Sequence, residues 1–120
     1  VSVGKKKLGK ADRQMKLYIV VREDLSPGAQ TAQSLHAFRE FVEYHPEIEK
    51  EWYKTSNTIV VLGCENEHAL AYLRLGAVER GIKFSIFREP DMDGSMTAIT
   101  FQPGPKTSEY LVNLRLAGKS

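Results

Sequence analysis

Two kinds of hydrophobic pattern alternate along this chain. Four short runs of apolar and β-branched residues predict strands, and the earliest runs are apolar enough to be buried on both faces. The predicted strands cover residues 16–22, 57–62, 82–87 and 95–101. In the last strand, the alternation of side chains places Met96, Ala98 and Thr100 on one face. The chain therefore supplies the strands of one small sheet.

Between these runs, apolar residues recur every three or four positions, which predicts helices. The first helix follows Pro27 and Gly28 and extends to residue 44. Its apolar face is predicted to carry Ala32, Leu35, Phe38 or Arg39, and Val42. His45 ends this helix, because the residue before a proline avoids helical geometry. A short acidic helix follows, with Ile48 and Trp52 as its apolar anchors.

Two more helices complete the pattern. Asn66 is a suitable cap for a helix that ends at Gly81, a residue that readily adopts the left-handed conformation. The inward residues of this helix are predicted to be Leu70, Leu73 and Ala77. A final helix, capped by Thr107 or Ser108, is predicted to carry Tyr110, Leu111 and Leu114.

The spacing of the strands indicates how they pair. Only about seven residues separate the third strand from the fourth, whereas a parallel crossover takes a dozen or more. These two strands are therefore predicted to be antiparallel. The fold class that follows is α/β: a three-layer-like sandwich in which a four-stranded mixed β-sheet is flanked by helices on both faces.

Charge divides the chain into two parts. The whole sequence has a net charge of +2, yet residues 1–16 hold six basic residues and one acidic residue. The remainder holds 11 basic and 14 acidic residues, so it is mildly acidic. We expect residues 1–14 to be a disordered basic tail, either a solvated leader or an arm that touches phosphate, and residues 15–120 to form one domain.

Composition also excludes several classes of protein. No apolar run approaches the length needed to span a bilayer, and the basic N-terminus lacks the apolar core of a signal peptide. Cys64 is the only cysteine, so no disulfide framework is expected, and the three histidines are too scattered for a metal signature. We therefore expect a cytoplasmic protein with no metal, no cofactor and no membrane partner.

The segment from Val20 to Ala37 carries the strongest functional signal. A buried strand turns sharply at Pro27 and Gly28 into a helix whose first turns hold small and polar residues. The N-terminus of a helix offers unpaired backbone N–H groups and a partial positive charge. The arrangement suits an anion or a developing oxyanion.

Two motifs in this order resemble the type II peptidyl-tRNA hydrolase family of archaea and eukaryotes. The first is the run Val-Arg-Glu-Asp-Leu at residues 21–25, followed by Gly28 and by Thr-Ala-Gln-Ser-Leu-His-Ala at residues 31–37. The second is Gly-Ser-Met-Thr at residues 94–97, with Gln-Pro-Gly-Pro at residues 102–105. Within this family the sequence Arg-Glu-Pro-Asp at residues 88–91 is most similar to the divergent branch of peptidyl-tRNA hydrolase domain-containing proteins.

The resemblance implies hydrolysis of the ester bond of peptidyl-tRNA, or of an N-blocked aminoacyl-tRNA, to release peptide and free tRNA. It implies a catalytic role for Thr97 on the fourth strand and for Glu89 after the third, or for Asp91 if the loop is gapped differently. The lysine that family members carry early in the first helix falls on Ala29 here. Peptidyl-tRNA is the implied partner, and homodimer formation is left open.

Five more residues are candidates for binding the substrate. Arg22 and Arg88 end two strands and could clamp a phosphate or a carboxylate, or form ion pairs with Asp24 and Glu89. Gln33 could hydrogen-bond the peptide or the ribose, or cap a backbone group. His36 is expected to pair with a neighbouring side chain at the interface of helix and sheet.

Two alternatives to the hydrolase stay open at this point. The same scaffold could be a non-catalytic module that binds RNA or a protein, with the basic tail supplying affinity for phosphate. It could also hold an unrelated acyl or amide ligand, because a fold does not fix its chemistry. Cys64 is expected to be a small apolar filler, since no basic residue near it in sequence would lower its pKa.

Overall fold

The computed structural model describes residues 15–118, so the prediction for residues 1–14 lies outside the described residues. The elements are β1 (Leu17–Arg22), α2 (Pro27–Tyr44), α3 (Pro46–Thr55), β2 (Ile59–Cys64), α4 (Glu67–Arg80), β3 (Phe84–Glu89), the 3₁₀ turn η1 (Pro90–Met92), β4 (Ser95–Phe101) and α5 (Pro105–Tyr110). The strand order is β2-β1-β4-β3. β1 and β2 are parallel, and β4 is antiparallel to both β1 and β3. The predicted α/β fold with a mixed four-stranded sheet is confirmed.

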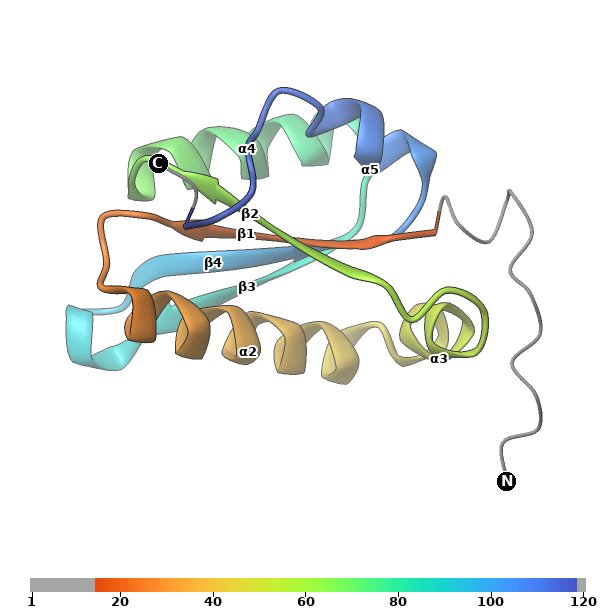
Figure 1. Cartoon of the computed structure of the whole chain (residues 1–120), viewed down its shortest axis with the longest axis horizontal. Helices are drawn as coiled ribbons and strands as arrows, with labels where there is room; N and C mark the ends of the chain where they lie inside the picture. The colour runs from red at the N-terminus through yellow and green to blue at the C-terminus, as the bar shows by residue number, and fades with distance from the viewer. Residues whose placement is uncertain (1–14, 119–120) are drawn as a thin grey trace.

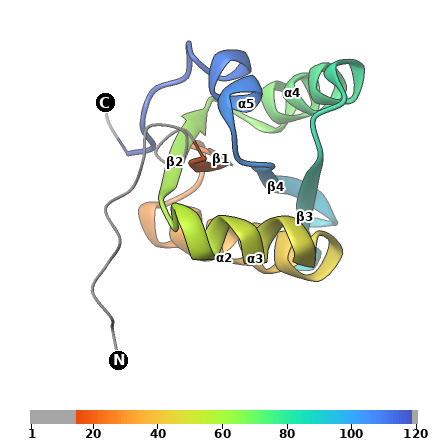
Figure 2. The same cartoon turned by 90° about the vertical axis from the view of Figure 1, so that its right-hand side faces the viewer.

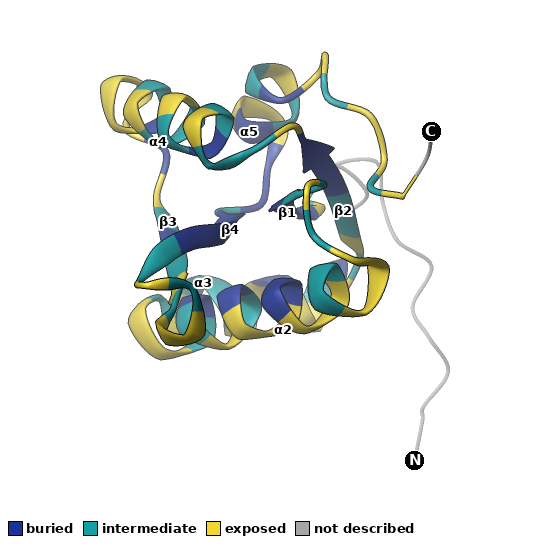
Figure 3. Ribbon diagram, turned by 90° about the vertical axis from the view of Figure 1, so that its left-hand side faces the viewer, coloured by how far each residue is buried: buried dark blue, intermediate teal, exposed yellow. Residues whose placement is uncertain are grey.

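The sheet lies between two layers of helices (Figure 1). α2 and α3 cover one face, and α4 and α5 cover the other, as the view along the layers also shows (Figure 2). Buried residues, dark blue in Figure 3, lie on the inner surfaces of both layers. The larger apolar cluster lies on the side of α4 and includes Leu70, Ala77 and Phe101. A smaller cluster of Leu17, Phe41 and Trp52 lies where α2 meets α3.

The buried face of α2 differs from the predicted one. Gln33, Ala37 and Phe41 point inward, whereas Ala32 and Leu35 are exposed, and 64% of the surface of Leu35 is accessible. The prediction failed because it placed apolar residues inward, while this helix buries a glutamine. The polar group of Gln33 is accommodated by side-chain hydrogen bonds, which a count of apolar positions does not register.

β4 contains a β-bulge at Thr97. Phe87 of β3 pairs with Ala98, whereas the next residue, Arg88, pairs with Met96, so Thr97 is the extra residue. Met96 packs in the cluster on the α4 side and Ala98 packs in the cluster under α2. The prediction that Met96 and Ala98 share a face is therefore wrong, because the bulge interrupts the regular alternation of side chains.

The helix ends follow local chemistry. As predicted, the Asn66 side chain caps α4 by accepting a hydrogen bond from the Ala69 N–H, and Gly81 ends it in the left-handed region at a φ of 68°. The prediction of Thr107 or Ser108 as a cap is wrong, since α5 begins earlier, after Gly104. β2 and β3 each begin two residues later than the predicted strands.

Candidate functional site

Three side chains from three different elements form one hydrogen-bonded series. The Thr97 hydroxyl on β4 donates to Gln33 Oε1 on α2 over 2.6 Å. Gln33 Nε2 in turn donates to Glu89 Oε1, at the end of β3, over 2.8 Å. Thr97 is fully buried and Gln33 is 6% exposed, whereas Glu89 lies partly exposed at the surface. The series therefore runs from the interior of the sandwich to the solvent.

The chemistry of the three groups fixes the orientation of the Gln33 amide. An ionised carboxylate only accepts hydrogen bonds, so the amide must present its NH₂ group to Glu89. The amide oxygen then faces Thr97, whose hydroxyl is the donor. The bulge in β4 is what directs Thr97 towards α2 and makes this contact.

The carboxylate of Glu89 is held at both oxygens. Its second oxygen accepts the Asp91 N–H over 3.3 Å, so Glu89 also caps the turn η1. The hydrogen bond from Gln33, reinforced by the one from Asp91, holds the pKa of Glu89 below its ordinary value. Glu89 is therefore ionised at neutral pH. Of the two carboxylates considered from the sequence, Glu89 is the one that contacts Gln33.

His36 lies beside this series on the outer side of α2. Its imidazole stacks on the ring of Phe87, with the ring centroids 4.4 Å apart and the planes 13° from parallel. This is the pairing with a neighbouring side chain that the sequence led us to expect. Its positive form also contributes to the low pKa of Glu89, although less than Gln33 and Asp91 do.

Arg22 is largely occupied by protein groups. Its Nε and Nη2 donate to the two Asp24 carboxylate oxygens, each over 2.9 Å. Its Nη1 donates to Ser95 Oγ and to the Met96 carbonyl, each over 3.3 Å. The hydrogen bond from Arg22 lowers the pKa of Asp24 below its ordinary value. Four of the five guanidinium N–H groups of Arg22 therefore donate hydrogen bonds within the protein. The bonds to Ser95 and Met96 tie β1 to the start of β4.

Arg88 is the more accessible of the two arginines. It lies on β3, on the other side of β4 from Arg22, and its Nη1 donates to the Gly94 carbonyl over 3.3 Å. The structure does not place it in an ion pair with Glu89, which was one expectation. Its side chain is exposed, so it can meet an anion from solvent.

Figure 2 shows the N-terminus of α2 on the side of β1 and β2, whereas the turn between β3 and β4 lies at the other edge of the sheet. The Ser26 side chain caps the helix by accepting the Ala29 N–H over 3.3 Å, and Pro27 has no N–H to offer. Among the described residues, the Gly28 N–H of this first turn has no hydrogen-bond partner, and the space beside Gly28 is open. Ala29, the residue on which the resemblance places a lysine, carries only a methyl group.

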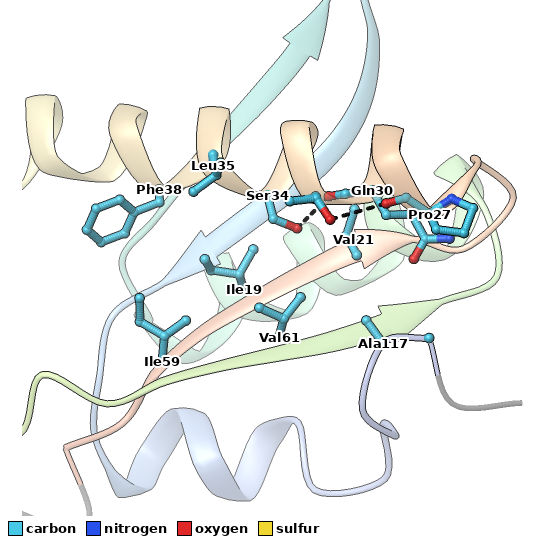
Figure 4. Close-up of a pocket in the computed structure, with 12 residues that line it drawn as sticks. Ile19, Val21, Pro27, Gln30, Ser34, Leu35, Phe38, Ile59, Val61 and Ala117 are labelled. Atoms are coloured by element: carbon cyan, nitrogen blue, oxygen red, sulfur yellow. Dashed lines mark hydrogen bonds between the residues drawn. The ribbon is translucent and has the colours of Figure 1, made fainter.

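An apolar groove lies on the side of α2 away from Glu89, between α2 and the strands β1 and β2, of which β2 is an edge strand (Figure 4). Its volume is about 550 Å³. Its apolar lining includes Ile19, Val21, Leu35, Phe38, Ile59 and Val61. The polar side chains of Gln30 and Ser34 in its wall donate to main-chain carbonyls of this chain, so the groove offers a surface for apolar groups.

Sequence reasoning missed one residue that shapes the site. Glu67, the first residue of α4, accepts the Met96 N–H at Oε2 over 2.7 Å, directly before the bulge. An acidic residue in the first turn of a helix gives no sequence signal for such a contact. Cys64 is buried, as a small apolar filler is, and burial raises its pKa to about 12.

Between residues 15 and 118, no group of three or more histidine, cysteine, aspartate or glutamate side chains is arranged to hold a metal ion. No helix in the described part of the chain is both long and apolar enough to cross a membrane.

Comparison with known proteins agrees with this architecture. The model of the peptidyl-tRNA hydrolase PTH2 family matches residues 15–116. The chain belongs to this family. Among curated protein sequences, none matches significantly. Among solved structures, a protein of unknown function from Agrobacterium tumefaciens strain C58, Atu0240, is similar with a TM-score of 0.65 and 14% identity, covering 86% of this chain and 97% of that one. At this identity the likeness concerns the fold alone.

Proposed function

We propose that this PTH2 family protein hydrolyses the ester bond of peptidyl-tRNA at the site built around Glu89. The observation that carries the proposal is the series Thr97–Gln33–Glu89, which fixes a carboxylate at the surface at the end of β3. Buried polar side chains that bridge three elements are costly to maintain unless every group is satisfied, and here each one is.

The chemistry needs a water that attacks the ester carbonyl, a group that takes its proton, and donors for the oxyanion. Glu89 accepts the proton as the water attacks and returns it to the ribose oxygen when the ester C–O bond breaks. Gln33 and Thr97 keep the carboxylate in place. The low pKa of Glu89 makes it a weak base, so orienting the water is its main contribution.

Arg88 is the group that we assign to the anionic part of the substrate. It is exposed and lies one residue before Glu89, where a tRNA phosphate near the ester would pass. In this scheme Arg22 and Asp24 contribute to substrate binding without contacting the substrate. Their ion pair holds the start of β4 in place. The protein would act in translation, in the cytoplasm.

The first test is release of peptide from an N-blocked aminoacyl-tRNA by the purified protein. Turnover should fall at least about tenfold in Thr97→Ala and in Glu89→Gln, while circular dichroism shows the same fold. His68→Gln is the matched control, since His68 is exposed on α4, on the opposite face of the sheet from this series. Unchanged turnover in both site variants would contradict the proposed site.

Ala29 favours one alternative, a non-catalytic module that binds RNA or a protein on the same scaffold. Without the family lysine, the first turn of α2 lacks an ammonium group. This alternative predicts no turnover, together with tRNA binding that weakens as salt rises and when residues 1–14 are removed. Binding that is indifferent to both changes would exclude it.

A further inference from the structure

A second hollow lies along the outer edge of the sheet. β3 is an edge strand, and a trough of about 650 Å³ runs beside it. Its floor is formed by residues 84–88 of β3, and its walls come from the end of α2 and from Arg74 of α4. Figures 2 and 3 both show β3 between the two helix layers with no strand outside it. The trough leads towards Glu89, the last residue of β3.

The hydrogen-bond pattern shows which main-chain groups of β3 face this trough. In an antiparallel pair, alternate residues direct both main-chain groups towards the partner strand. The Lys83 carbonyl accepts from the Gln102 N–H on the inner side, and the Phe84 carbonyl accepts from His45 Nε2 on the outer side over 3.2 Å. Ile86, two residues after Phe84, therefore points its N–H and its C=O outward. Within residues 15–118 neither group has a hydrogen-bond partner, so both can pair with another chain.

We propose that the β3 edge binds the peptide part of the substrate as an added, fifth strand. This inference rests on the proposed function, and it names how that site recognises its peptide. The added strand would pair its main chain with Ile86. Main-chain pairing does not depend on the side chains of the peptide, which suits an enzyme whose substrates carry any sequence.

The charges of the trough decide between a peptide and RNA. Glu40 and Arg74 lie in its walls and Arg88 lies at the Glu89 end of its floor, so the trough carries both signs, and the Arg39–Glu43 pair lies on the same end of α2. A polyanion gains little from such a mixture. A peptide main chain is neutral and needs only the hydrogen-bonding groups of Ile86. The Ser85 hydroxyl, which is buried and has no partner within the described residues, also lines the trough.

The position of Glu89 fixes the direction of the peptide. The ester is at the carboxyl end of the peptide and must reach Glu89, which is at the carboxyl end of β3. The peptide therefore runs parallel to β3. Glu89 lies three residues beyond Ile86, or about 10 Å along a strand. A single N-blocked amino acid is too short to reach Ile86 from Glu89, whereas a tetrapeptide is long enough.

The wild-type protein allows the central test, with N-acetyl-alanyl-tRNA and N-acetyl-tetraalanyl-tRNA compared. The tetrapeptide should raise kcat/KM about tenfold, as expected of two main-chain hydrogen bonds. N-methylation of the amide that pairs with Ile86 should remove this gain, so one position in a scan of N-methylated substrates should behave like the short substrate. Equal kcat/KM for the short and long substrates would overturn the proposal.

A protein variant tests the same contact from the other side. Ile86→Pro removes the outward N–H but leaves the β3–β4 pairing intact, because this N–H faces away from β4. For this variant, kcat/KM for the long substrate divided by kcat/KM for the short substrate should fall towards one. Ile86→Val keeps the N–H and should retain the wild-type ratio. If both variants lose the ratio equally, the effect comes from packing and the proposal fails.

A binding measurement separates this proposal from the proposed hydrolysis. The probe is N-acetyl-tetraalanine joined by an amide bond to 3′-aminoadenosine, which mimics the end of the substrate and resists hydrolysis. In ¹⁵N NMR spectra, its addition should shift the Ile86 amide even if no substrate is turned over. Shifts confined to the groove of Ile19 and Ile59 would mean that the peptide binds in that groove. An Ile86 shift that depends on protein concentration without the probe would mean that the β3 edge binds a second copy of the chain. Either result overturns the inference.

Discussion

Replacing Thr97 by valine removes one hydroxyl from the interior and leaves its shape almost unchanged. Gln33 Oε1 then loses its donor while it stays buried, which costs about 1–3 kcal/mol. The added methyl group regains about 0.8 kcal/mol of burial. We expect Thr97→Val to lower the free energy of unfolding by up to about 2 kcal/mol. Because the Gln33 amide is no longer fixed, turnover should fall at least about tenfold.

The matched variant is Thr97→Ser, which keeps the donor and loses one methyl group. It should cost about 1 kcal/mol of stability and keep turnover within about threefold of wild type. Urea unfolding measures the free energies, with an unchanged m-value as the sign that the compactness of both states is preserved. Peptide release from N-blocked aminoacyl-tRNA measures turnover.

The double variant Thr97→Val with Gln33→Leu completes the test. Removing both partners of a buried hydrogen bond is nearly neutral compared with removing one. The double variant should therefore be about 1 kcal/mol more stable than the sum of the single changes predicts. Strict additivity, or a Thr97→Val protein with the stability and turnover of wild type, would refute the role given to this hydrogen bond.

Three further outcomes follow from the pKa values. Gln33→Leu removes the main cause of the low pKa of Glu89, so the acid limb of the pH profile of kcat/KM should move to higher pH; an unmoved limb would exclude Glu89 as the titrating group. Asp24→Asn should cost about 1 kcal/mol at neutral pH by unpairing Arg22. Because the folded-state pKa of Asp24 is lowered, this stabilisation is present above the unfolded pKa of about 4 and is lost as pH falls through the folded pKa. Urea unfolding curves of wild type and variant should therefore converge in acid, and a constant gap would contradict the pairing. Cys64, with its pKa raised to about 12, should resist Ellman's reagent while the protein is folded and react in denaturant; rapid labelling of the folded protein would show that it is accessible.

The sheet could be predicted from sequence because its signal is local. Each strand is a short apolar run, and the brief link before Gly94 already required β3 and β4 to be antiparallel. The inward face of α2 could not be predicted in this way. Gln33 is buried because of partners that lie 56 and 64 residues further along the chain, and a helical periodicity carries no information about them.

The residues of the candidate site were named from the sequence, but the hydrogen bonds that connect them were not predicted. The motif resemblance led to Thr97, Glu89 and Gln33, but it assigned them separate tasks in catalysis and binding. Their hydrogen bonds put them in one series, with Gln33 at its centre. Arg22 was proposed as a clamp for substrate, although its pairing with Asp24 already uses most of its donors. Such occupancy depends on three-dimensional neighbours, which residue identity does not reveal.

The bulge in β4 makes the site depend on a count of residues as well as on their identity. Thr97 points towards α2 only because β4 is one residue longer than the segment of β3 that it pairs with. Losing one residue between Ser95 and Ala98 would restore regular pairing and change which side chain meets Gln33. In the course of evolution, a change of one codon in length could therefore abolish or create this site while every strand and helix stayed in place.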